Sequence, residues 1–363
     1  MTWMGKFIPA NCGYEIVPQS LMIKRDIIVL GASAGGFTAM KRLFARIPSD
    51  LKAAVFIVWH ISPEVRGILP DVLNGFNTLP ASHAVNIEPV RMGRIYVAPP
   101  DHHLLLEKHT MRISRGPREN RFRPAIDPLF RSAAHAYGPR VIGVILSGAL
   151  DDGSAGLWTV KEYGGLAVVQ DPRDAEVSSM PESAIQAAKT DYVVPVDDMA
   201  RLLAELVGQE IVGESYKGKV GGLTQIENKI AMEDKPLKYD FIEFGELAPY
   251  TCPECHGVLT ALKEGGRVRF RCHTGHGFTT DSLLSSVTAN IEMNLWTAIR
   301  SIQECIMLLN HIGDHFAEVN EPKLAAMYFK KAKEAEKRAD IVRQAVWNHE
   351  QLSKDSIMFD SDQ

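Results

Sequence analysis

The sequence predicts an α/β protein whose first domain is a three-layer α/β/α fold with a mostly parallel sheet and an edge hairpin. A small cysteine- and histidine-containing module and a helical hairpin follow. Three observations lead to this prediction. Short apolar runs alternate with helical patterns over residues 26–205, as in parallel α/β sheets. Cysteines and histidines cluster within residues 249–279, and apolar residues recur every three or four positions from Asp281 onward.

The first domain contains six strand candidates and four helical patterns. Each helical pattern lies between two apolar runs, which favours parallel strands with helices on both faces of the sheet. His103–Arg115 differs, because two alternating runs flank Lys108-His109-Thr110 and predict an edge hairpin. The strand candidates are Asp26–Leu30, Ala53–Trp59, Arg94–Ala98, Val141–Leu146, Leu166–Gln170 and Tyr192–Val196, and the helical patterns are Phe37–Ile47, Ala125–Tyr137, Ser154–Glu162 and Ser183–Ala188.

The C-terminal part reads as two long amphipathic helices that are separated near Asn320-Glu321-Pro322. Two such helices joined by a short loop predict an antiparallel hairpin. Residues 208–248 are rich in Gly, Lys and Glu, and we interpret them as a linker. The expected divisions are an N-terminal extension (1–25), the first domain (26–207), the linker (208–248), the Cys/His module (249–279), the helical hairpin (280–352) and a tail (353–363).

Composition sets limits on partners and location. The 363 residues are 45% hydrophobic, and 40 basic against 44 acidic residues give a net charge of −4. This balance gives no reason to expect nucleic acid as a partner. No stretch approaches the roughly 20 apolar residues of a membrane span, and the N-terminus does not resemble a signal peptide. We therefore expect a cytoplasmic protein without membrane insertion.

The string Gly31-Ala32-Ser33-Ala34-Gly35-Gly36 stands between a predicted strand and a predicted helix. It fits a turn that exposes a nucleophilic serine, and it also fits a phosphate-binding glycine loop. A dinucleotide site would need an acidic residue at the end of the second strand, where this chain has His60. The histidine at this position therefore favours the nucleophile turn of a hydrolase over a dinucleotide-binding loop.

Ser33, His60 and Asp152 each follow a predicted strand, so they are expected at the same edge of a parallel sheet. A serine hydroxyl needs a base to take its proton, and the base needs a group that orients it. Singly, the three residues could equally be a helix cap, a loop histidine and a helix N-cap. Together they predict a catalytic triad.

Cys252, Cys255, Cys272 and His276 have the spacing of a tetrahedral zinc site, C-x₂-C followed by C-x₃-H. Four protein ligands leave no open position, so the predicted Zn²⁺ is structural, in a zinc-ribbon-like module. His256 and His273 are spare ligands, and His273 could compete with His276. The alternative is that the cysteines are free thiols in a loop. No cofactor is expected for catalysis.

Six ordered segments resemble the catalytic domain of the chemotaxis protein-glutamate methylesterases, the CheB family. The resemblance covers about residues 25–205 and implies Ser33 as nucleophile, His60 as general base and Asp152 as the orienting acid. The segments are Val29–Gly36, Trp59–Pro63, Tyr96–Asp101, Arg123–Asp127, Gly143–Gly148 with Asp151-Asp152-Gly153, and Met180-Pro181.

The chain departs from the family pattern at two places. Ala34 replaces a threonine that often follows the nucleophile, and Ala149-Leu150-Asp151 replaces Met-Gly-Asn. The resemblance implies that the residue at Ala149 supplies an oxyanion-hole amide, which is a backbone donor and tolerates the side-chain change. Only about 25 residues precede the first strand. We therefore expect no N-terminal receiver domain and no control by phosphorylation in cis.

The resemblance implies that the chain hydrolyses glutamyl methyl esters of a methylated receptor protein through an acyl-enzyme on Ser33, and that it also deamidates glutamine. The alternatives are a catalytically idle scaffold and a small-molecule esterase. The C-terminal helices are expected to bind a partner or self-associate, without contributing to the chemistry. Truncation after Gly208 should then leave turnover of a small ester nearly unchanged.

Overall fold

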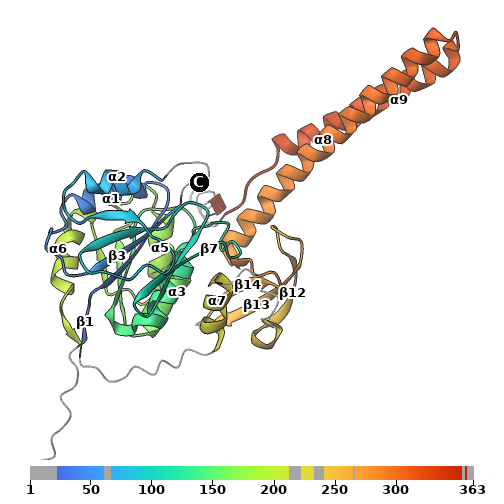
Figure 1. The fold of residues 1–363 in the computed structure, drawn as a ribbon. Helices are drawn as coiled ribbons and strands as arrows, with labels where there is room; N and C mark the ends of the chain where they lie inside the picture. The colour runs from blue at the N-terminus through green and yellow to red at the C-terminus, as the bar shows by residue number, and fades with distance from the viewer. Residues whose placement is uncertain are drawn as a thin grey trace, which may run out of the picture.

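The computed structural model describes residues 23–60, 67–211, 222–232, 241–264, 266–353 and 356–357. Figure 1 shows an α/β domain, a small antiparallel sheet beside it, and an arm of two long helices that extends away from both. The predicted fold class is therefore confirmed in each of its three parts.

The large sheet has seven strands in the order β10-β9-β8-β2-β3-β5-β4, and every neighbouring pair is parallel. Its central strands are uniformly buried, as expected for runs covered on both faces. The sequence did not predict β4, which is only three residues long. The strands are β2 (Ile27–Ala32), β3 (Ala54–Trp59), β4 (Ala81–His83), β5 (Arg94–Val97), β8 (Val141–Ile145), β9 (Leu166–Gln170) and β10 (Tyr192–Val194).

Two hydrophobic cores fill the space between the sheet and its helices. One core joins the sheet to α1 (Gly36–Phe44), α2 (Leu69–Asn74) and α6 (Val196–Leu206). The other joins the opposite face to α3, α4 and α5. The latter three helices are α3 (Ile126–Tyr137), α4 (Ser154–Glu162) and α5 (Ser179–Ala187). Helices α2 and α6 were not among the sequence predictions.

The predicted hairpin is present as β6 (His103–Glu107) and β7 (Thr110–Ser114). An edge hairpin was expected to extend the large sheet. The two strands instead form a separate two-stranded sheet. Leu104, Leu106 and Met111 pack into the core beside α3. Because these apolar residues have a helix to cover them, the hairpin needs no edge pairing. A second short pair joins β1 (Ile23–Lys24) to β11 (Glu210–Ile211).

The range that we interpreted as a linker contains ordered structure. Helix α7 (Gly222–Met232) packs against α3, and a 3₁₀ turn at Phe241–Phe244 leads into the small sheet. Glu227 and Ile230 of α7 are fully or almost fully buried. Apolar periodicity does not predict this helix, because its buried face combines charged, polar and apolar side chains.

The small sheet is antiparallel in the order β12-β13-β14-β15, and the helical arm follows it directly. In the arm, Phe316 stacks on Tyr328 across the two helices, and buried alanines of α9 let the backbones approach. Among the described residues, no helix is long and apolar enough to cross a membrane. The elements are β12 (Glu246–Thr251), β13 (Val258–Glu264), β14 (Arg267–Cys272), β15 (Gly277–Thr279), α8 (Thr280–Glu318) and α9 (Pro322–Trp347).

Candidate catalytic site and metal centre

Ser33 and His60 are brought together by the register of two adjacent parallel strands. Ala32 and Trp59, the last residues of β2 and β3, pair with each other, and Ser33 and His60 are the residues that follow them. The main-chain N–H of His60 donates to the carbonyl of Ala32 at 3.1 Å. Strand β8, which leads to Asp152, pairs with β2 on its other side. The three residues therefore meet at the carboxyl ends of neighbouring strands, where α/β sheets bind ligands.

The turn that carries Ser33 depends on glycine. Gly35 has a φ of 72°, and a Cβ there would lie 2.5 Å from Ser147 Oγ. The N–H of Ser33 donates to the carbonyl of Ser147, and the Trp59 indole N–H donates to the carbonyl of Ser33. The backbone on both sides of the hydroxyl is thus fixed, which suits a nucleophile turn.

The three side chains form a continuous hydrogen-bonded chain. Ser33 Oγ lies 3.2 Å from His60 Nδ1, and His60 Nε2 lies 2.9 Å from Asp152 Oδ2. The side chains of His60 and Asp152 are 2% and 1% exposed. With Nε2 protonated toward the carboxylate, Nδ1 has its lone pair toward the serine hydroxyl, as a general base requires.

Asp152 is held in its ionised form by neighbouring donors. Burial by itself would raise its pKa, but the hydrogen bond and charge of His60 and the N–H groups of Ile126 and Asn120 outweigh burial and lower the pKa. Ile126 N donates to Oδ2 at 2.7 Å, and Asn120 Nδ2 donates to Oδ1 at 2.8 Å. The carboxylate therefore has fixed partners on both oxygens.

Asn120 and Phe122 also support the site and were not among the residues predicted from the sequence. Phe122 stacks on the His60 ring with centroids 3.7 Å apart, and Asn120 binds Asp152. Both belong to a tight turn that directly precedes the Arg123–Asp127 segment noted in the sequence. Periodicity carries no signal for such a turn, because it lies outside any helix or strand.

A cleft of about 540 Å³ opens in front of Ser33 and His60. Arginines Arg118, Arg121 and Arg123 line it together with aromatic side chains. Arg123 pairs with Asp101, and Arg118 lies 3.6 Å from Glu254. Within the described residues Arg121 has no carboxylate partner, and its Nη1 donates to Ser285 Oγ. The cleft is therefore suited to an acidic group.

One main-chain donor close to Asp152 in the sequence has no partner among the described residues. The N–H of Ala149 has no acceptor within the described part of the chain, whereas the neighbouring N–H of Leu150 donates to Ser179 Oγ. Leu150 has a φ of 63°, a left-handed conformation that a leucine rarely adopts. Backbone strain of this kind is found at functional sites. Ala34, where the family often has threonine, is exposed at the cleft.

The four predicted metal ligands lie together in the small sheet. Their ligand atoms are all within 4.8 Å of one another. Cys255 Sγ lies 3.7 Å from Cys272 Sγ, and His276 Nδ1 lies 3.7 and 3.6 Å from the sulfurs of Cys252 and Cys272. Tetrahedral Zn²⁺ bonded to sulfur and nitrogen gives edges of about 3.6–3.8 Å. The cluster can therefore hold a metal ion.

Neither spare histidine belongs to this cluster. His276, and not His273, supplies the nitrogen ligand atom, and the His273 ring lies against Gly257. His256 has a φ of 60° in the turn after Cys255. Part of the motif segment Trp59–Pro63 lies outside the described residues, namely Ile61, Ser62 and Pro63.

A parallel α/β sheet with a Ser–His–Asp chain at the carboxyl ends of its strands has the architecture of a serine hydrolase. The family model of the CheB methylesterase matches residues 28–203. A Leptospira interrogans protein, provisionally named protein-glutamate methylesterase/protein-glutamine glutaminase, is 43% identical over 50% of this chain and 94% of its own length. The chain belongs to the CheB methylesterase family.

Two further relatives match the same region. Protein-glutamate methylesterase/protein-glutamine glutaminase 2 of Anaeromyxobacter dehalogenans is 36% identical over 50% of this chain and 53% of its own length. The crystal structure of the Thermotoga maritima CheB methylesterase catalytic domain is 31% identical and covers 51% of this chain and all of its own, with a TM-score of 0.48. The Cys/His cluster and the helical arm lie beyond the part matched by the family model.

Proposed function

We propose that this chain is a protein-glutamate methylesterase that hydrolyses glutamyl methyl esters through an acyl-enzyme on Ser33. The observation that carries the proposal is the hydrogen-bonded chain from Ser33 through His60 to Asp152, with distances of 3.2 and 2.9 Å. The family membership supports it, since the Leptospira interrogans and Anaeromyxobacter dehalogenans relatives carry this activity in their names.

In the first half-reaction Ser33 Oγ attacks the ester carbonyl carbon while His60 Nδ1 takes the hydroxyl proton. The N–H of Ala149 would donate to the oxyanion of the tetrahedral intermediate. Asp152 stays ionised and stabilises the imidazolium. The C–O bond to methoxide then breaks, and His60 protonates the leaving group, so that methanol departs.

In the second half-reaction water attacks the acyl-enzyme, and His60 takes one proton from it. Cleavage of the ester to Ser33 returns the serine hydroxyl and releases the glutamate side chain. The net reaction consumes one water and gives one methanol and one carboxylic acid. A glutamine substrate would follow the same course with ammonia as the leaving group, which is the glutaminase activity that the relatives' names include.

The arginines of the cleft support a protein substrate with further carboxylates near the reacting residue. Arg121 contributes a positive charge with no carboxylate partner among the described residues, and it lines the same cleft as His60. A charged cleft raises the local concentration of an oppositely charged substrate. We therefore propose a methylated receptor segment rich in glutamate as the substrate, with the enzyme in the cytoplasm.

We also propose that Cys252, Cys255, Cys272 and His276 bind one structural Zn²⁺. The ligand spacing supports this assignment, because the four ligand atoms lie within 4.8 Å of one another, and four protein ligands leave no open position for chemistry. The arm of α8 and α9 is proposed to bind a partner or a second chain. It exposes large apolar side chains, among them Trp296, Met307 and Trp347.

The test is methanol release from a methylated receptor by the wild-type chain and by Ser33→Ala. The wild type should release methanol and Ser33→Ala should not. Labelling of Ser33 by a fluorophosphonate without methanol release from any methylated protein would favour a small-molecule esterase. Absence of both reactions would favour an idle scaffold and refute the proposal.

A further inference from the structure

A four-residue turn, Glu119–Phe122, lies between the candidate triad and the C-terminal module. This module comprises the small sheet and the first turn of α8, residues 246–282. Glu119 and Phe122 exchange two main-chain hydrogen bonds, at 3.2 and 2.9 Å. The residues between them, Asn120 and Arg121, have φ values of 51° and 76°. Two successive residues at positive φ define a tight turn of the type I′ kind, which asparagine tolerates and arginine seldom enters. The turn is strained, so its surroundings must hold it in place.

One side of this turn contacts the triad through Asn120. Its Nδ2 donates to Asp152 Oδ1 at 2.8 Å and to Asp127 Oδ2 at 3.0 Å. An amide nitrogen donates and a carboxylate only accepts, so the nitrogen end of Asn120 must face the two aspartates. Asn120 is 4% exposed, and water cannot readily replace it as a donor.

The other side of Asn120 is bound by the first turn of α8. Asn120 Oδ1 accepts from Thr279 N at 3.0 Å and from Ser282 Oγ at 3.1 Å. Thr279 is the N-cap of α8, and Thr279 and Ser282 form a reciprocal capping box. The main-chain N–H of Asn120 also donates to the carbonyl of Gly277 in β15. The amide is thus fixed at one end by the C-terminal module.

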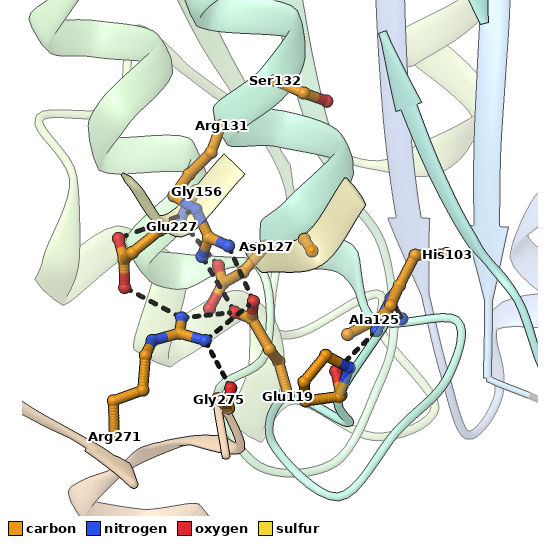
Figure 2. Close-up of polar contacts among 12 residues, drawn as sticks. His103, Glu119, Ala125, Asp127, Arg131, Ser132, Gly156, Glu227, Arg271 and Gly275 are labelled. Atoms are coloured by element: carbon orange, nitrogen blue, oxygen red, sulfur yellow. Dashed lines mark hydrogen bonds and ion pairs between the residues drawn. The ribbon is translucent and has the colours of Figure 1, made fainter. Parts of the chain in front are cut away.

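A buried ion cluster fixes the preceding residue. Glu119 lies between Arg131 of α3 and Arg271 of β14, and both arginines also approach Glu227 of α7 (Figure 2). Burial would raise the pKa of Glu119, but the two arginines lower it to about 2, so the carboxylate stays charged. Arg271 also donates to the carbonyl of Gly275, close to the predicted metal ligand His276. The module therefore binds both Glu119, by an ion pair, and Asn120, by hydrogen bonds.

We propose that Asn120 is a positioning residue of the triad, and that Thr279 and Ser282 at the start of α8 hold its amide in the orientation that Asp152 requires. This inference rests on the proposed function in one respect, that Ser33 is the nucleophile. It replaces the expectation that the chain beyond Gly208 stands apart from the chemistry. The C-terminal module completes the active site by fixing a residue that binds the orienting acid.

The experiment uses the full chain and measures the second-order rate constant for labelling of Ser33 by a fluorophosphonate. Labelling carried to completion counts the active sites, so that loss of folded protein is separated from loss of rate per site. Ser282→Ala removes one of the two donors to Asn120 Oδ1. Ser286→Ala is the matched control, because Ser286 is also buried in α8 but its hydroxyl donates only to the carbonyl of Ser282 within the helix.

Ser282→Ala should lower the rate constant per site about fivefold, as expected for loss of one hydrogen bond. Asn120→Ala should lower it about 100-fold, because the carboxylate that orients the imidazole loses its own anchor. Ser286→Ala should stay within twofold of the wild type. Thermal unfolding of each variant reports whether the fold is retained.

The proposal is wrong if Ser282→Ala and Ser286→Ala label Ser33 at equal rates. It is also wrong if Ser282→Ala lowers only the labelled fraction, because the contact would then be purely structural. A wild type that is labelled at Ser33 but releases no methanol from methylated protein would refute the proposed function. The same rate constants would still decide the role of Asn120.

Discussion

Arg271 Nη2 lies 3.1 Å from Glu119 Oε2, which joins the residue before Cys272 to the turn that supports the candidate triad. Both side chains are almost fully buried, and each has a second ionic partner, Arg131 for Glu119 and Glu227 for Arg271. Removal of either side chain would leave an excess of one charge in a buried cluster. The predicted metal centre and the catalytic cleft are therefore mechanically connected, although they belong to different parts of the sequence.

The first prediction concerns the metal. Purified protein should contain about one equivalent of zinc per chain, and Cys255→Ser should lose it, because the site would keep only three good ligands. Elemental analysis measures the metal, and hydrogen exchange of β14 measures the accompanying loss of order. Cys305→Ser is the control, since Cys305 is an exposed cysteine of α8 outside the cluster. Full zinc content in Cys255→Ser would contradict the assignment.

The second prediction concerns the triad. Ser33→Ala or His60→Ala should reduce methanol release by a factor on the order of 10³ or more. Asp152→Asn should also be severe, because the amide cannot accept the His60 Nε2 proton in the same way and favours the wrong tautomer. The measurement is turnover of a methylated protein at saturating concentration. Near-normal turnover by Ser33→Ala would rule out the acyl-enzyme mechanism.

The third prediction concerns the turn that carries Ser33. Gly35→Ala should destabilise the fold and slow labelling of Ser33, because the new Cβ would lie 2.5 Å from Ser147 Oγ and 2.6 Å from Glu176 Cβ. Gly208→Ala is matched to it in backbone conformation, with φ of 84°, but has open space around the Cβ. Gly208→Ala should cost only the left-handed penalty, about 1 kcal/mol. Equal losses of stability in the two variants would show that the close approach to Ser147 is unimportant.

The fourth prediction concerns pH. Burial raises the pKa of Asp151 to about 7, above its value of 3.8 in an unfolded chain. The folded state therefore binds this proton more tightly, and its contribution to stability is lost as the pH rises from about 4 to 7. Titration of Asp151 makes the free energy of unfolding fall with pH over this range, by at most about 1.4 kcal/mol per pH unit. Asp151→Asn should remove this contribution and make the slope shallower.

Chemical unfolding at pH 5, 6 and 7 measures this slope. Asp127, whose pKa burial also raises to about 7, keeps part of the slope in the variant. The same exchange at the exposed Asp71 is the control and should leave the slope unchanged. An identical slope in wild type and Asp151→Asn would exclude Asp151 as a source of the pH dependence.

The parallel sheet and the positions of Ser33, His60 and Asp152 after strands were predictable from the sequence. Alternation of apolar runs and helical spacing sets the fold class, because each element must bury its apolar face. The four candidate metal ligands were also found from the sequence, since C-x₂-C and C-x₃-H are short-range spacings. A residue that follows a parallel strand is directed to one edge of the sheet, so these predictions needed no knowledge of long-range contacts.

The distant residues that support the site became apparent from the three-dimensional structure. Asn120 binds Asp152 on one side and the first turn of α8 on the other, across 159 and 162 residues of sequence from Asn120 to Thr279 and Ser282. Glu227 lies in a segment that composition marks as a linker, yet it is buried among three arginines. A polar residue is buried only where partners from other segments satisfy it. Local sequence patterns do not specify such partners, because they come from segments far apart in the chain.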